Sequence, residues 1–73
     1  MFEGKEYVYR VYKEGSFSKA AKSLYISQPS LSAAVKREES RIGNPIFDRS
    51  TSPVSLTECG QKYVDCVERI LAV

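Results

Sequence analysis

Hydrophobic residues recur every three or four positions over most of the first 42 residues, which is the spacing of one face of an α-helix. This spacing predicts a first helix over residues 3–14, with Val8 and Val11 on its apolar face. Gly15 follows and favours a helix end, because glycine adopts the left-handed backbone conformation at little cost. The chain is therefore predicted to begin with one short amphipathic helix.

Two more helices are predicted before residue 43. Either Ser16 or Ser18 can cap the second helix, and its core face consists of four apolar residues. They are Phe17, Ala20, Ala21 and Leu24. Ser27 can cap a third helix over about residues 28–42, and Pro29 fits its first turn, where the missing N–H is not needed. A short helix, a tight turn and a longer helix form the helix-turn-helix arrangement.

After Gly43 the pattern changes from helical spacing to short extended runs. Residues 46–49 form one run, a loop of turn-forming residues follows, and apolar and polar residues alternate over 54–56. These runs predict a two-stranded hairpin, or wing. Thr57 can then cap a final helix that continues to Val73. The predicted fold class is mainly α: a winged helix-turn-helix with a three-helix core, a two-stranded wing and a C-terminal linker or dimerisation helix.

The length of 73 residues allows one domain, which is too small to hold both a core and a deep substrate cavity. We expect the winged helix-turn-helix to span residues 1–57 and the linker or dimerisation helix to start within 58–73. No apolar run approaches the ~18–20 residues that span a bilayer. The N-terminus also lacks the apolar region of a signal peptide. The sequence therefore predicts a cytoplasmic protein with no membrane contact.

The residue inventory excludes several kinds of chemistry. The chain has no histidine and only two cysteines, without a Cys-x-x-Cys pair, which excludes zinc fingers and histidine-based acid–base catalysis. Cys59 and Cys66 are seven residues apart, which along a helix is roughly 10 Å and beyond disulfide reach. Both are expected to act as small apolar residues. We expect neither an enzyme nor a bound metal or cofactor.

The positive charge is concentrated in one segment. Residues 15–37 carry a net charge of +4 and no acidic residue, whereas residues 1–14 sum to zero and residues 38–73 to −2. The basic residues of this segment are Lys19, Lys22, Lys36 and Arg37. A polyanion such as DNA would be attracted to it. A solvated face with uneven charge is the alternative interpretation.

The predicted third helix has an apolar stripe formed by Leu31, Val35 and Ile42, and an opposite face of small, polar or basic residues. Such a face can enter the major groove of DNA, which is about 12 Å wide. Gln28, at its exposed end, can pair with adenine through two hydrogen bonds. The other outward residues can contact base edges, thymine methyl groups or phosphates; they are Pro29, Ser32, Ala33 and Lys36. Because any small surface helix has a polar outer face, this feature indicates DNA only together with the charge and the wing.

Two further predictions concern the wing and the last helix. Arg49 ends the first wing strand, where it can lie along the DNA backbone or enter the minor groove. A surface arginine paired with Asp48 or another acid is the alternative. The last helix has an apolar stripe broader than one small domain needs, so part of it is expected to pack on a second copy of the chain; a fourth core helix is the alternative. The candidate dimerisation residues are Tyr63, Val64, Val67, Ile70 and Leu71.

Four segments of the chain resemble the signature of LysR-type transcription regulators, in that family's order and spacing. They are GSFSKAAKSL at residues 15–24, SQPSLS at 27–32, GNPIFDR at 43–49 and LTECG at 56–60. The resemblance implies a winged helix-turn-helix head that binds duplex DNA as a dimer, with its third helix in the major groove. Together with the helix face, it makes eight residues candidates for DNA binding. They are Ser27, Gln28, Pro29, Ser30, Ser32, Ala33, Lys36 and Arg49.

The resemblance also implies that the fourth helix pairs antiparallel with its dimer partner and leads to a larger domain that senses a small molecule. Family members usually activate or repress nearby genes in response to such a molecule. These 73 residues do not contain that domain. We therefore expect either a shortened form or a natural fragment of a regulator, in which any effector would act only through the missing domain.

The chain departs from the family pattern in places. Glu38 stands where leucine is usual and lies on the apolar stripe, where an unpaired buried carboxylate would be costly. We expect it to reach solvent or a basic neighbour. Lys5 also replaces a usual leucine, and Ala33 removes one possible base contact. A winged-helix module that binds protein instead of DNA is the rival hypothesis, and steep salt dependence of DNA binding would distinguish the two.

Overall fold

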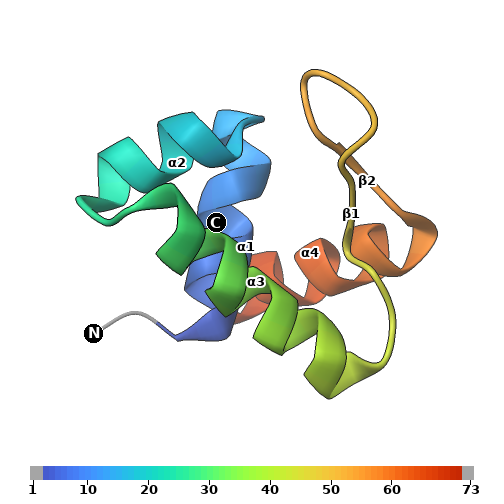
Figure 1. The fold of residues 1–73 in the computed structure, drawn as a ribbon. Coiled ribbons are helices and arrows are strands. Elements are labelled where there is room, and N and C mark those ends of the chain that lie inside the picture. Colours follow the sequence, from blue (N-terminus) through green and yellow to red (C-terminus); the bar gives the residue numbers. More distant parts are fainter. Residues whose placement is uncertain (1–2, 72–73) are drawn as a thin grey trace.

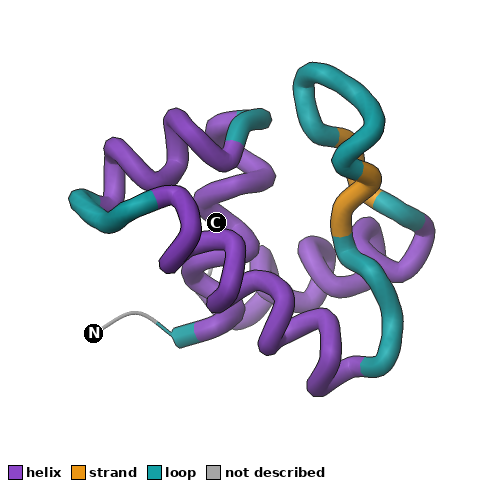
Figure 2. The backbone as a smooth tube through the Cα atoms, viewed as in Figure 1, coloured by secondary structure: helices purple, strands orange, loops and turns teal. Residues whose placement is uncertain are grey.

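The computed structural model describes residues 3–71, and the predicted end of the last helix at Val73 lies outside them. Within these residues, three helices, a two-stranded hairpin and a fourth helix follow one another (Figures 1 and 2). Their bounds are α1 Gly4–Glu14, α2 Phe17–Leu24, α3 Gln28–Ile42, β1 Phe47–Asp48, β2 Ser55–Leu56 and α4 Glu58–Leu71. The predicted winged helix-turn-helix is confirmed, and the two strands are shorter than the extended runs in the sequence.

Local capping interactions explain where the helices begin and end. Gly15 and Gly43, with φ of 70° and 81°, adopt the left-handed conformation at the ends of α1 and α3. Ser16 is the cap of α2, because its hydroxyl accepts the N–H of Lys19 at 3.2 Å. Ser27 caps α3 in the same way, accepting the N–H three residues later at 3.2 Å. These contacts determine where α2 and α3 begin.

The core lies where α1, α2 and α3 pack on one another, and the first wing strand and α4 cover the rest of it (Figure 1). All four apolar residues predicted for the core face of α2 are buried. On α3, Leu31 and Val35 are fully buried and Ile42 packs on the edge of the core. The apolar stripe of α3 therefore faces inward, which leaves its opposite face to solvent.

The wing is an antiparallel pair in which Phe47 lies opposite Leu56. The Phe47 side chain is buried, and its ring packs edge-on against that of Phe17, with centroids 5.7 Å apart. At the far end of the hairpin, Thr57 donates its hydroxyl to the Pro45 carbonyl at 2.7 Å and accepts the N–H of Gly60 at 2.9 Å. Thr57 is therefore the cap of α4, as predicted. Its hydrogen bond to Pro45 also joins the start of α4 to the segment that leads into the wing.

The α4 helix corrects part of the dimerisation prediction. Val64 and Val67 are only 1% and 2% exposed within a single chain, so neither side chain can contact a second copy. Tyr63 packs against the same core and is half-buried. Ile70 and Leu71 remain 65% and 36% exposed. The start of α4 is thus a fourth core helix, and only its end keeps an apolar surface.

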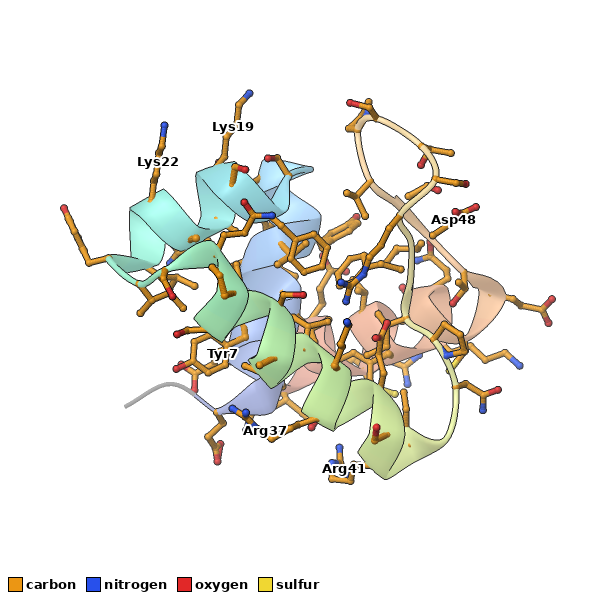
Figure 3. The ribbon with its side chains drawn as sticks, in the orientation of Figure 1. Tyr7, Lys19, Lys22, Arg37, Arg41 and Asp48 are labelled. Atoms are coloured by element: carbon orange, nitrogen blue, oxygen red, sulfur yellow. The ribbon has the colours of Figure 1, made fainter. Side chains whose placement is uncertain are left out.

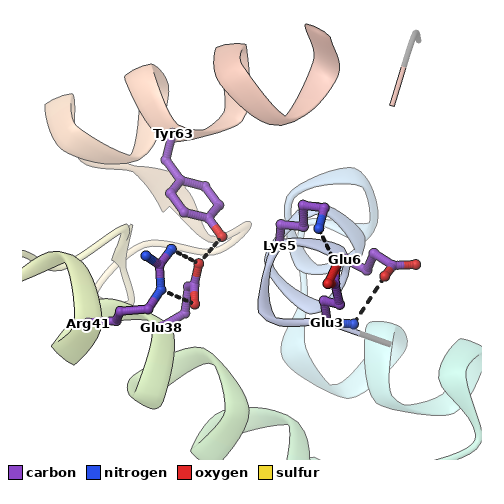
Figure 4. A network of polar contacts seen from close by, with 6 residues as sticks. All are labelled: Glu3, Lys5, Glu6, Glu38, Arg41 and Tyr63. Carbon is purple, nitrogen blue, oxygen red and sulfur yellow. Dashed lines mark hydrogen bonds and ion pairs between the residues drawn. The ribbon is translucent and has the colours of Figure 1, made fainter. Parts of the chain in front are cut away.

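The Glu38 carboxylate is accommodated by a basic neighbour, as the sequence led us to expect. Arg41 donates to its two oxygens from Nε at 3.0 Å and Nη2 at 2.6 Å, and the Tyr63 hydroxyl donates to it from α4 (Figure 4). Nearby, the Lys5 ammonium forms an ion pair with Glu3. Polar contacts between α3 and α4 therefore occupy the place where the family pattern has an apolar side chain.

Candidate nucleic-acid interface

The outer face of the first half of α3 forms an exposed surface beside α2. Gln28, Pro29, Ser30, Ala33 and Lys36 are exposed. The candidate Ser32 is half-buried, and Ser27 is exposed at the cap. Of the charged segment, Lys19 and Lys22 project from α2 into solvent (Figure 3). The structure therefore places Lys19 and Lys22 on the helix that neighbours the α3 candidates, whereas Arg37 of the same segment lies beside Tyr7 and the start of α1.

A groove of about 280 Å³ separates the start of α3 from the wing. Its lining comes from α2, α3 and the hairpin and is rich in hydroxyl groups. Lining residues include Ser16, Phe17, Ser18, Gln28, Ser32, Arg49 and Ser52. Three of the eight candidates thus line one concave surface, with hydrogen-bonding groups from three elements.

Arg49 lies inside this groove instead of projecting from the wing. Its Nη1 donates to the Ser32 hydroxyl at 3.0 Å, and its guanidinium carbon lies 4.3 Å from the centroid of the Phe17 ring. Its Nη2 pairs with the Glu39 carboxylate at 3.5 Å. The pairing of Arg49 with an acid is therefore present, with Glu39 of α3 as the partner and not Asp48. The side chain is still 35% exposed.

Glu39 connects the wing to α3. Its Oε2 accepts the backbone N–H groups of Ile46 and Phe47 at 2.8 and 3.3 Å, while Oε1 faces Arg49. Two backbone N–H groups at the start of β1 are thereby hydrogen-bonded to a side chain of α3. Sequence reasoning missed this role, because nothing in the local pattern indicates that a helix carboxylate serves backbone groups seven and eight residues away.

Gln28 also has a side-chain partner outside α3. The Ser18 hydroxyl of α2 donates to its side-chain oxygen at 3.0 Å. Ser18 was considered only as an alternative helix cap, and its contact with Gln28 follows from the turn that brings α2 against α3. Both Gln28 and Ser32 are therefore oriented by side chains from outside α3.

Alternative kinds of site find no support within residues 3–71. No three residues among histidine, cysteine, aspartate and glutamate gather there in a way that would hold a metal ion. No described helix combines the length and apolarity needed to cross a membrane. Cys59 is half-buried and Cys66 exposed, so the expectation that both pack as apolar residues holds only in part.

Comparisons with known proteins agree on one family. A family model described as bacterial regulatory helix-turn-helix protein, lysR family, matches residues 3–61. A probable RuBisCO transcriptional regulator of Cyanidioschyzon merolae is 50% identical over 60 residues, which is 82% of this chain and 20% of that protein. The HTH-type transcriptional regulator BudR of Klebsiella aerogenes is 45% identical over 67 residues, or 92% of this chain and 47% of BudR.

A solved structure places the same fold on DNA. The crystal structure of the BenM DBD/catB site 1 DNA complex contains a chain with a TM-score of 0.89 and 32% identity to this one. The match covers 94% of this chain and 74% of the BenM chain. The chain spans 20% and 47% of the length of the two curated relatives, and three quarters of this shorter DNA-bound domain.

Proposed function

The chain belongs to the lysR family of bacterial regulatory helix-turn-helix proteins, and from this premise we propose that it binds duplex DNA to regulate transcription. In this proposal α3 enters the major groove and the wing lies on the backbone or in the minor groove. The observation that carries it is the exposed, small-residue start of α3, which lies between the basic α2 and the wing groove. Nothing bulky on this face prevents close approach to base edges.

The residues divide into two roles. Gln28 and Ser32, whose orientations are fixed, face the bases, and the exposed Pro29 and Ala33 touch thymine methyl groups. Lys36 contacts a phosphate, as do the basic residues of α2. Ser27 and Ser30 share a hydrogen bond of 2.8 Å at the helix start, where the positive end of the helix dipole favours a DNA phosphate. Arg49 completes the surface from within the groove. No cofactor takes part in these contacts.

We also propose that the chain pairs with a second copy of itself and that its activity responds to a small-molecule effector. Ile70 lines a groove of about 450 Å³ between the start of α1, the end of α3 and α4, and Leu71 follows it. These exposed apolar side chains support pairing of two chains through the end of α4. By analogy with its longer relatives, we propose that a small-molecule effector binds a further domain. The proposed binding of DNA also supports a location in the cytoplasm.

Titration of random duplexes with the purified chain, followed by fluorescence anisotropy at two salt concentrations, tests this function. We expect affinity to fall steeply with salt, because bound lysine and arginine release counterions from DNA. Sequencing of the bound fraction should return an inverted repeat, because the two chains of a dimer contact equivalent half-sites. A folded chain that does not bind at low salt would contradict the function and favour the protein-interaction module.

Lys36→Ala examines the phosphate contact. The substitution should weaken binding equally on selected and random duplexes and reduce the salt slope by about 1. Lys62→Ala is the matched control, since it removes the same charge from an exposed position on α4, outside the proposed interface. Equal effects of the two substitutions would show that Lys36 acts only through overall charge.

A further inference from the structure

We propose that Ser18 is a positioning residue that turns the Gln28 side chain so that the recognition helix presents hydrogen-bond donors to the DNA. The expected consequence is selection of base edges that offer acceptors, namely guanine or thymine, at the position opposite Gln28. This inference rests on the proposed function, because it concerns the same surface of α3.

The contact between the two helices determines which end of the Gln28 amide is free. A glutamine side chain has an accepting oxygen and a nitrogen with two donating hydrogens. The Ser18 hydroxyl donates to Oε1 at 3.0 Å, so the oxygen is turned toward α2. Nε2 is then the end that remains for DNA. The backbone of Ser18 is itself fixed, because it lies in the first turn of α2, two residues after the Ser16 cap.

Ser32 is oriented in the same sense. Its Oγ accepts a hydrogen bond from Arg49 at 3.0 Å, which leaves the hydroxyl hydrogen to donate. Ser32 lies four residues after Gln28, about 6 Å along the helix. Two neighbouring side chains of α3, the exposed Gln28 and the half-buried Ser32, therefore both offer donors. Arg49 and Ser18 produce this pattern from the wing and α2, on either side of α3.

The bases differ in the hydrogen-bond donors and acceptors that they present in the major groove. In the major groove guanine offers two acceptors, O6 and N7, and thymine offers O4, whereas adenine offers one acceptor beside one donor. A glutamine that is free to rotate favours adenine, because it can match both groups. With its oxygen engaged by Ser18, Gln28 would place an N–H opposite the adenine amino group. The structure therefore favours guanine or thymine over the adenine contact expected for an unconstrained glutamine.

Selection from randomised duplexes with four variants tests the proposal. Gln28→Ala identifies the base position that depends on Gln28. At that position the unmodified chain should enrich guanine or thymine. Ser18→Ala should increase the share of adenine at that position and lower the preference for guanine or thymine over adenine by about fivefold or more. This factor is the low end of what one bidentate contact provides. Ser18→Thr, which retains the hydroxyl, should keep the original preference, and Ser18→Val, its isosteric partner without a hydroxyl, should lose it.

Ser40→Ala is the control for serine removal, because this residue is exposed near the opposite end of α3. The Thr and Val pair decides the outcome even where Ser18→Ala fails to fold, since the two side chains have the same shape. Enrichment of adenine by the unmodified chain at the Gln28-dependent position would overturn the inference. So would equal preferences for Ser18→Thr and Ser18→Val. Absence of any DNA binding by the unmodified, folded chain would instead contradict the proposed function itself.

Discussion

Glu38 shows how a single residue can depart from a family pattern and still fit the fold. Its side chain is only 11% exposed, yet both oxygens have partners, from Arg41 on the same helix and Tyr63 on α4. The Arg41 hydrogen bonds hold the pKa of the Glu38 carboxyl below its ordinary value, against the opposing effect of burial. A buried carboxylate with such partners is tolerated, whereas an unpaired one would not be.

The lowered pKa of Glu38 predicts a dependence of stability on pH. Because the folded pKa lies below the ordinary value of 4.5, ionised Glu38 stabilises the fold above that pH, and the contribution is lost as pH falls through the folded pKa. Glu38→Gln should therefore lower the free energy of unfolding at neutral pH and flatten its decline in acid, as measured by urea denaturation. Some decline should remain, since the pKa of Asp48 is also lowered, by hydrogen bonds from Ser50.

Glu14→Gln serves as the control, because Glu14 is exposed at the end of α1. An acid decline as steep in Glu38→Gln as in the unmodified chain would contradict the assigned role of Glu38.

At the scale of elements, the helices were predictable because their signals are local. The caps Ser27 and Thr57 and the terminating Gly15 and Gly43 lie within a few residues of the ends that they fix. The strands were predicted less well, because their ends depend on pairing across the hairpin, and only two residues on each side pair. Local sequence does not determine such pairing.

Contacts between elements were beyond sequence reasoning for the same reason. The acid that pairs with Arg49 is ten positions away on α3, not the adjacent Asp48. Likewise, the sequence analysis assigned Val64 and Val67 of α4 to contact with a second copy, although both pack inside the single chain. Their burial depends on how closely α4 approaches α1 and the core. Gly60 permits that approach, since a Cβ at this position would lie 2.0 Å from the Ile46 carbonyl oxygen.

The attachment of the wing to α3 gives a prediction for Glu39. Glu39→Ala removes the acceptor of the Ile46 and Phe47 N–H groups and should lower the free energy of unfolding by about 1–3 kcal/mol, the typical cost of unpaired buried polar groups. Hydrogen exchange at these two amides should accelerate more than exchange within α2.

The neighbouring exposed Ser40 provides the control, and Ser40→Ala should change stability by no more than about 0.5 kcal/mol. Unchanged protection of the Ile46 and Phe47 amides in Glu39→Ala would show that another group positions the wing.

At the scale of the whole molecule, two surfaces are separated by the core. The start of α3, α2 and the wing groove form one surface, with basic and hydroxyl-bearing side chains. The end of α4 forms the other, with the exposed Ile70 and Leu71. In the proposed function, the first surface contacts DNA and the second contacts another copy of the chain. Composition alone indicated neither surface, because the net charge of +2 conceals the basic segment.

The most direct test of this account is an NMR titration of the isotope-labelled chain with a duplex selected by binding. If α3 enters the DNA groove, the largest amide shifts should fall in the first two turns of α3, at the start of α2 and in the wing, because these are the segments proposed to contact the DNA. Amides in the middle of α1 and α4 should change little. Shifts concentrated on α1 and α4, with the start of α3 unaffected, would contradict the central claim that α3 is the element that enters the DNA groove.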